Sequence, residues 1–219
     1  MKAKEIIKNN KKKVGAAAMA AMLLVGGATY AYFTDTNLLT NTFTFGSVDS
    51  TLVETAWDAA DPSEHENLAP NAVIAKDPKV VNNGSLDFYT FIKVTVPVKD
   101  VKVASADGTQ VTSGKTDMFS WTANSGWTLV DTVDNGDTKD YIYAWGSADA
   151  MTKVAPSSET GTLFDSVKIA NIIEGQGIEG TALDLIVKDY SIQTTDLTDA
   201  DTTNPTEVWK IVSGQQEAN

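Results

Sequence analysis

The sequence contains no cysteine, no arginine and a single histidine among its 219 residues. Without cysteine, a disulfide framework, a thiolate zinc site and a cysteine nucleophile are excluded. A helical zinc-peptidase motif needs two histidines four residues apart, but His65 is followed by Ala69 at that spacing. A Ser–His–Asp triad would also have to use His65, and no G-x-S-x-G motif occurs. We therefore predict no catalytic residue and no metal ligand, and we interpret Ser63–Asn67 as a solvated acidic loop.

Positive charge is scarce as well, with 17 lysines against 29 acidic residues and a net charge of −12. Six of the lysines and only one acidic residue lie in residues 1–31. Removing this segment, which carries +5, takes the net charge from −12 to −17. Phosphate contacts need lysine or arginine, so this balance argues against a nucleic-acid partner. It favours solubility and association with cations.

Only one long hydrophobic run occurs, Val14–Gly27, and its fourteen residues are fewer than the roughly 20 of a membrane-spanning helix. It follows a lysine-rich start and precedes small residues, which is the order of a signal peptide. We expect residues 1–32 to be this signal, with the cleavage site among Ala31, Tyr32 and Phe33. An uncleaved anchor is the alternative. The expected product is a secreted protein without a stable membrane anchor.

The rest of the chain has short alternating segments and little helical periodicity. Phe88–Val98 is the clearest, with apolar residues on one face and Lys93, Thr95 and Pro97 on the other. Pro97 cannot donate to a ladder, so it predicts an edge or a bulge. The other expected elements are strands at Ile74–Asn83, Trp127–Val133, Tyr141–Trp145, Leu163–Ile173 and Leu183–Gln193, a loop at Asp100–Asp117, and a short helix at Pro205–Ser213. This pattern predicts an all-β, antiparallel sandwich with long loops and a short C-terminal helix.

Ahead of these strands, Phe33–Asn41 is polar and rich in threonine, whereas Thr42–Leu52 alternates like a strand. Phe43 and Phe45 share one face, and past Gly46 the apolar residues change phase, which suggests a bulge. The expected organisation is a signal (1–32), an N-terminal segment and candidate donor strand (33–52), and a sandwich domain (53–219). The alternation also fits an ordinary first strand of the same domain, because pairing within and between chains has the same pattern.

Two groups of side chains could bind ligands. Asp131, Asp134, Asp137 and Asp140 surround Gly136, and oxygen-rich loops can hold Ca²⁺. The spacing does not match an EF-hand, so we expect a solvated turn and no cofactor, with Ca²⁺ as the open alternative. The tryptophans and tyrosines could form a carbohydrate-binding face, but at strand spacing they are more often core or cross-strand pairs.

Three stretches resemble known proteins. GGATYAYFTDT followed by NTFTFGSVD resembles signals cut by SipW-type signal peptidases. Asn67–Val96, NLAPNAVIAKDPKVVNNGSLDFYTFIKVTV, is similar to the NL-x-P-G…NNGSL block of the TasA/camelysin family, with Asn71 where that family commonly has glycine. The tail, Ile192-Gln193 and then Glu207-Val208-Trp209, is similar to the tails of related surface proteins.

This resemblance implies a jelly-roll sandwich, export to the cell surface and a role in extracellular matrix fibres. In such fibres the freed N-terminal strand completes the sheet of a neighbouring subunit. The expected anchors are Phe43, Phe45, Val48 and Leu52, and the expected partners are other copies of the chain and, during export, the signal peptidase. The same family has been labelled a metallopeptidase, which is one alternative. A monomeric carbohydrate- or surface-binding module is the other.

Overall fold

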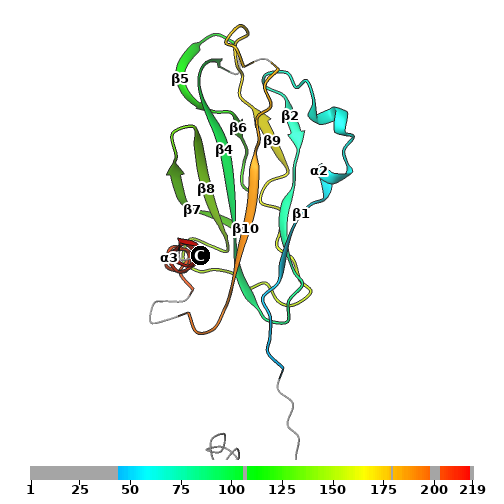
Figure 1. The fold of residues 1–219 in the computed structure, drawn as a ribbon, viewed down its shortest axis with the longest axis vertical. Helices are drawn as coiled ribbons and strands as arrows, with labels where there is room; N and C mark the ends of the chain where they lie inside the picture. Colours follow the sequence, from blue (N-terminus) through cyan, green and yellow to red (C-terminus); the bar gives the residue numbers. More distant parts are fainter. Residues whose placement is uncertain (1–43, 106–107, 179, 198–202, 218–219) are drawn as a thin grey trace, which may run out of the picture. The chain divides into compact units, whose positions relative to one another are not determined.

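The computed structural model describes residues 44–105, 108–178, 180–197 and 203–217 (Figure 1). The chain divides into two units, Met1–Thr44 and Phe45–Asn219, and all described residues except Thr44 belong to the second. The expected signal peptide and its cleavage residues Ala31, Tyr32 and Phe33 lie outside the described residues. The expected boundaries after residues 32 and 52 therefore stay predictions.

Strands dominate the described residues. They are β1 (Ser50–Glu54), β2 (Val73–Ala75), β3 (Pro78–Asn82), β4 (Phe88–Ala104), β5 (Val111–Asp117), β6 (Phe119–Ser120), β7 (Trp127–Asp134), β8 (Thr138–Trp145), β9 (Ser166–Ile169) and β10 (Ile186–Gln193). The helices are α2 (Thr55–Ala59), the 3-10 turn η1 (Pro62–His65) and α3 (Pro205–Glu217). The paired strands run antiparallel, and the all-β fold with a short C-terminal helix is confirmed. In the part of the chain that the structure describes, no helix is long and apolar enough to span a bilayer.

β4 is the central strand of the largest sheet, whose order is β10-β4-β8-β7. β5 pairs with the far part of β4, from Val98 to Ala104. Pairing with β10 ends at Thr95, so one side of β4 is an edge where Pro97 lies. This placement agrees with the missing N–H of proline. A three-stranded sheet, β2-β9-β6, and the β1-β3 pair form the facing layer.

The main core lies between these layers. From β4 it receives alternate side chains, among them Phe88, Ile92 and Val94, and from the facing layer Val80 and Val167. Each of these five side chains is at most 2% exposed. Burial of this kind is the dominant favourable term in folding, at about 1.5–3 kcal/mol for a large apolar side chain.

A second core lies on the opposite face of the same sheet. Tyr89 and Phe91 of β4 point into it, and Val208 and Val212 of α3 cover them. Asn204 caps this helix, since its Oδ1 accepts from the N–H groups of Thr206 and Glu207 at 3.0 and 3.2 Å. The first part of β4 is therefore buried on both faces, which its predicted one-sided alternation did not anticipate.

Several expected boundaries were wrong. Asp100–Asp117 is mostly strand, because β4 continues to Ala104 and pairs with β5. The expected strand Ile74–Asn83 is two strands in different sheets. Leu163–Ile173 contributes only the four residues of β9, and the C-terminal helix extends beyond Ser213 to Glu217. Polar sequences can pair at an edge where little side-chain burial is needed, so composition alone misassigned β5.

Candidate functional site

The turn Asn82–Leu86 holds the backbone that leads into β1. The N–H groups of Asn83 and Gly84 donate to the carbonyl oxygen of Asp49 at 2.9 and 3.1 Å. Those of Ser85 and Leu86 donate to the carbonyl oxygen of Ser47 at 3.0 and 3.3 Å. We call these contacts between 47–49 and 82–86 the clasp. They fix the place at which the N-terminal segment joins the domain.

Two residues of the turn explain the clasp. Asn82 is fully buried, and its Nδ2 donates to the carbonyl oxygens of Leu86 and Val154 at 2.9 and 2.8 Å. Its Oδ1 accepts from the N–H of Gly84 at 2.9 Å. Gly84 allows the close approach, since a β-carbon there would lie 2.4 Å from the carbonyl oxygen of Ser47. The motif Asn-Asn-Gly-Ser-Leu therefore has a structural role at the entry of the N-terminal segment.

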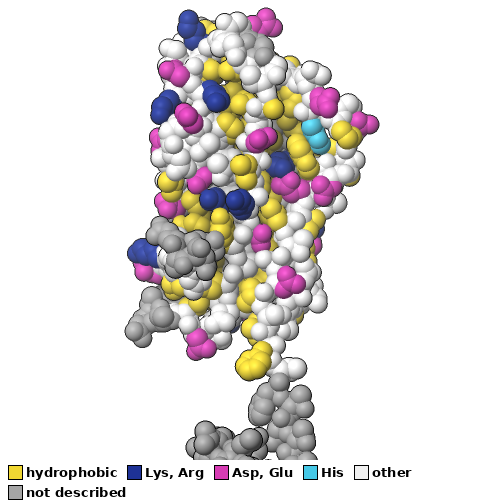
Figure 2. Space-filling view, in the orientation of Figure 1, with side chains coloured by type: hydrophobic (Ala, Val, Ile, Leu, Met, Phe, Trp, Pro, Cys, Tyr) yellow, Lys and Arg dark blue, Asp and Glu magenta, His cyan; other side chains and the backbone are white. Residues whose placement is uncertain are grey.

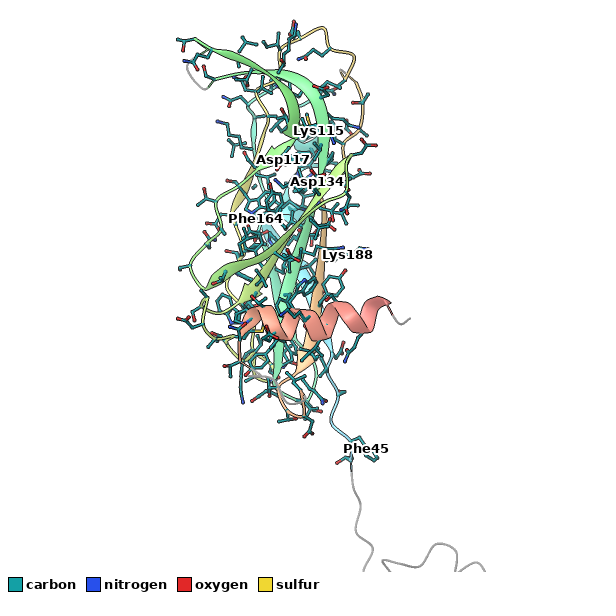
Figure 3. All side chains as sticks on the ribbon, turned by 90° about the vertical axis from the view of Figure 1, so that its left-hand side faces the viewer. Phe45, Lys115, Asp117, Asp134, Phe164 and Lys188 are labelled. Atoms are coloured by element: carbon teal, nitrogen blue, oxygen red, sulfur yellow. The ribbon has the colours of Figure 1, made fainter. Side chains whose placement is uncertain are left out.

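Directly before the clasp, Phe45 has no cover in the described structure, and 98% of its surface is exposed. Figure 3 shows it beyond the sheets, at the point where the described chain begins. Val48 is 37% exposed, and Phe43 lies outside the described residues. The apolar surface of Phe45 is thus left in water beside a fixed backbone, where it is available for contact with another molecule.

The strand expected over Thr42–Leu52 with a bulge at Gly46 is not observed as such. Residues 44–49 have no strand partner among the described residues, and β1 begins only at Ser50. Leu52 pairs with Val80 and packs against the chain's own core. The clasp accounts for the difference, because the turn takes up the carbonyl groups of Ser47 and Asp49 that a ladder would otherwise use. Of the expected anchors that the structure describes, Phe45 and Val48 are exposed, whereas Leu52 packs against the core.

β1 and β10 lie side by side without a backbone ladder among the described residues (Figure 1). One side-chain hydrogen bond joins them, from Ser50 Oγ to Asp189 Oδ2 at 2.6 Å. β1 pairs with β3 and β10 pairs with β4, so each has a backbone edge that no described strand satisfies. We call this boundary the β1/β10 seam. Unpaired edges of this kind can receive a strand from another chain.

The only histidine is packed against a tryptophan rather than held with other metal-binding groups. The rings of His65 and Trp57 stack at 3.6 Å with an interplanar angle of 3°. The ammonium of Lys76 lies 4.3 Å from the centre of the Trp57 ring and 2.5 Å from Glu54 Oε2. Because imidazole occupies one face of the indole, the ammonium covers the other, a favourable cation–π arrangement.

Three of the four aspartates of the β7–β8 hairpin accept hydrogen bonds from the protein itself. Asp134 Oδ1 accepts from the N–H of Gly136 at 2.8 Å, and Asp131 Oδ1 accepts from the N–H of Thr132 at 2.7 Å. Asp140 accepts from Thr95 Oγ1 at 2.5 Å. Within the described ranges, no three His, Cys, Asp or Glu side chains stand together as a metal site. The expected turn lies between β7 and β8 and its residues 134, 135 and 137 are exposed, whereas the absence of a cofactor and the Ca²⁺ alternative both stay predictions.

The tryptophans of the middle region pack with neighbouring strands. Trp127 is buried, lies 5.3 Å from the ring of Trp145, and donates from Nε1 to the carbonyl oxygen of Gly161 at 3.0 Å. Trp121 packs against Tyr141 and Phe164, each at 5.3 Å between ring centres. These are the cross-strand and core pairs expected from strand spacing, and Trp121 also lines a surface pocket with Asn124 and Asp165.

Next to the Trp57–His65 stack is a groove of about 690 Å³. Its apolar walls are formed by Trp57, Leu68, Pro70, Phe119, Ile169, Ile172, Ile173 and Leu183, among others. Glu66, Glu174 and Asp184 also line it, and no lysine does. Figure 2 shows the histidine with hydrophobic side chains beside it and acidic side chains on the same face. Sequence reasoning missed this groove, because its two sides come from segments about 100 residues apart.

Comparison with known families adds to this picture. Residues 9–116 match the family model described as camelysin metallo-endopeptidase. The resemblance to the TasA/camelysin family is confirmed. The matched camelysin region includes the clasp, the Trp57–His65 stack and β4, and ends within β5. A search of the curated proteins gave no match.

The camelysin description implies a catalytic metal, but the donor set of this chain does not fit one. Zinc in a peptidase needs three protein ligands and an open position. Here the single histidine is stacked face to face on Trp57 and its Nε2 is buried. No cysteine is available, and the nearby carboxylates do not gather into a group of three donors in the described residues. We therefore derive no catalytic step through a metal.

Proposed function

We propose that this camelysin relative is a secreted structural protein of the cell surface or extracellular matrix, and that it self-associates through its N-terminal segment. The observation that carries the proposal is the exposure of Phe45 beside a fixed backbone. Residues 47–49 are held by the clasp, whereas Phe45 is 98% exposed. A segment that joins the domain at a fixed backbone is suited to binding a neighbouring subunit.

The receiving surface in this proposal is the β1/β10 seam. A strand added there would form main-chain hydrogen bonds with the unpaired edges of β1 or β10, and alternate side chains would set its register. Donor and acceptor surfaces are different, so the contact can repeat from one subunit to the next, and we propose that the rotation between successive subunits does not close. The proposed product is therefore a fibre rather than a closed dimer.

Charge opposes this assembly. The expected mature chain carries −17, so neighbouring subunits repel one another. Dissolved salt screens charges over about 10 Å at 0.1 M, and divalent cations screen more strongly. Fibres of this protein should therefore form more readily as salt or divalent-cation concentration increases.

The proposal is tested by replacing the exposed Phe45 together with the expected anchor Phe43, as Phe43→Asp with Phe45→Asp, in the mature protein. We expect a folded chain that stays monomeric by sedimentation and forms no fibres in electron microscopy under conditions in which the wild type does. Val133→Asp, on the exposed side of β7, is the matched control and should leave assembly unchanged. A double variant that unfolds, together with a wild type that is monomeric at every salt concentration, would contradict the proposal.

The absence of peptidase activity is part of the same proposal. The family description favours a metallopeptidase, whereas the stacked histidine and the missing donor group favour a structural role. A monomeric carbohydrate- or surface-binding module is the remaining alternative, and a wild type that stays monomeric while binding a polysaccharide would support it.

A further inference from the structure

The groove beside Trp57 has a defined position relative to the β1/β10 seam. Trp57 follows the end of β1 by three residues, and Leu183 precedes the start of β10 by three. The groove therefore lies next to the end of the seam at which β1 finishes and β10 starts. A strand lying along the seam with its N-terminus toward this end would lead directly into the groove.

The groove itself combines apolar walls with negative charge. Four isoleucines, Ile169, Ile172, Ile173 and Ile178, line it together with Phe119 and Trp57. Its charged lining residues, apart from His65, are the carboxylates of Glu66, Glu174 and Asp184. Each of these three acidic residues is exposed, so the carboxylates are available to a ligand. The complementary ligand is an apolar group that carries a positive charge.

This chain contains one segment with that chemistry. Cleavage after either Ala31 or Tyr32 would create an N-terminal residue with an aromatic side chain, Tyr32 or Phe33. An α-amino group has a pKa of about 7.7–8.0, so it is mostly charged at pH 7. The new terminus thus joins an aromatic ring and an ammonium group in one residue. Before cleavage this residue lies inside the chain, and its backbone nitrogen is an uncharged amide.

We propose that the groove binds the cleaved amino terminus of a second copy, with the aromatic side chain among the isoleucines and the ammonium beside the carboxylates. This inference rests on the proposed function, since it needs the N-terminal segment of one subunit to lie on the seam of the next. It makes signal cleavage a requirement for assembly, because an uncleaved chain has no free terminus at this place.

The segment Phe33–Asn41 is long enough to reach from the seam of the neighbouring subunit to its groove. From Asp189, which accepts a hydrogen bond from Ser50 at the start of β1, to Leu183 at the groove is six residues, or about 20 Å of extended chain. The nine residues Phe33–Asn41 span up to about 30 Å when extended. If Phe43 lies near Ser50 and Asp189 of the neighbour, Phe33 reaches the groove with length to spare. The threonine-rich composition of this segment suits an extended strand.

Disulfide trapping tests the contact directly, because the natural chain has no cysteine. Mature protein with Thr34→Cys is mixed with mature protein carrying Leu68→Cys, a groove residue that is 36% exposed. Val133→Cys on β7, 41% exposed and outside the groove, replaces Leu68→Cys in the control mixture. Circular dichroism checks that each variant is folded before oxidation.

We expect roughly tenfold more covalent dimer with Leu68→Cys than with Val133→Cys, because binding raises the effective concentration of the two thiols. Equal yields of dimer from the two mixtures would overturn the inference. So would trapping within a single chain carrying both Thr34→Cys and Leu68→Cys, since the terminus would then occupy its own groove. Normal fibres without selective trapping would reject the groove and leave the proposed function standing, whereas no fibres and no trapping would reject both.

A second set of variants tests whether the carboxylates of the groove are needed to bind the amino terminus. Glu66→Gln, Glu174→Gln and Asp184→Asn together remove the negative lining of the groove, and we expect about threefold less trapped dimer at low salt. The control is Asp131→Asn with Asp134→Asn in the β7–β8 hairpin, which removes negative charge outside the groove. An equal or larger loss of dimer in this control would contradict the ammonium contact.

Discussion

Gly84 lies so close to Ser47 that a β-carbon at position 84 would be 2.4 Å from the Ser47 carbonyl oxygen. The same β-carbon would be 2.8 Å from the backbone nitrogen of Asp49. Both neighbours are backbone atoms and cannot rotate away as a side chain could. The clasp therefore depends on glycine through space and not through an unusual backbone angle.

Gly84→Ala should loosen the clasp and lower the free energy of unfolding by about 1–3 kcal/mol, the usual effect of forcing an extra methyl group into packed structure. Chemical denaturation measures the loss, and limited proteolysis should show faster cutting near Ser47. Gly214→Ala in α3 is the matched control. A β-carbon there meets no atom within 4 Å, so alanine should stabilise the helix. Equal stabilities for the two variants would contradict the role of Gly84.

The raised pKa of Tyr141 predicts that the folded protein loses stability at alkaline pH. Partial burial, helped by the hydrogen bond it donates to the Asp117 carboxylate, raises its pKa above the usual value of about 10. The folded state thus holds this proton more tightly than the unfolded state. The contribution is complete below pH 10 and is lost as the pH rises through the folded-state pKa. A hydrogen bond with Tyr141 also raises the pKa of Lys139, and this contribution has the same sign.

Urea denaturation between pH 8 and pH 11 checks this dependence. Tyr141→Phe removes the titrating hydroxyl and should flatten the alkaline decline in stability. A smaller slope should remain, because burial also raises the pKa of Tyr143. If Tyr141→Phe and the wild type lose stability in parallel above pH 9, the interaction with Asp117 does not have this effect.

The packing of His65 predicts that a peptidase assay will detect no activity. Its ring stacks on Trp57, and the described residues offer no group of three metal-binding side chains around it. Purified mature protein should therefore not cleave casein above background, with or without added zinc. The opposite result would be cleavage that a chelator inhibits and that His65→Ala abolishes.

Substitution of Val208 measures how much the packing of the C-terminal helix contributes to the stability of the domain. It is fully buried in the second core, against the face of β4 that carries Tyr89 and Phe91. Val208→Ala should destabilise the domain by about 2 kcal/mol through lost burial and a residual cavity. Lys210→Ala, whose exposed ion pair with Glu207 lies on the outer side of α3, should change stability by less than about 0.5 kcal/mol. Similar effects from both substitutions would show that α3 does not depend on this core.

Local patterns determined much of the fold. Phe88–Val98 alternates because one face of β4 meets the main core, and the turn at 134–137 separates β7 from β8 as its Asn-Gly pair predicts. The start of α3 at Asn204-Pro205 was predictable from the sequence, because helix capping involves residues that are neighbours in the chain. The family resemblance was also readable, since the Asn67–Val96 block lies in one continuous stretch.

Tertiary structure decided what depends on residues far apart in the chain. The sequence could not show that Asn82–Leu86 would take the carbonyl groups of Ser47 and Asp49, or that pairing within the domain would begin at Ser50. It could not show that α3 would cover the second face of β4 or that Trp57 and Leu183 would border one groove. Periodicity reports which side of a segment is apolar, whereas the identity of the partner depends on how the whole chain packs.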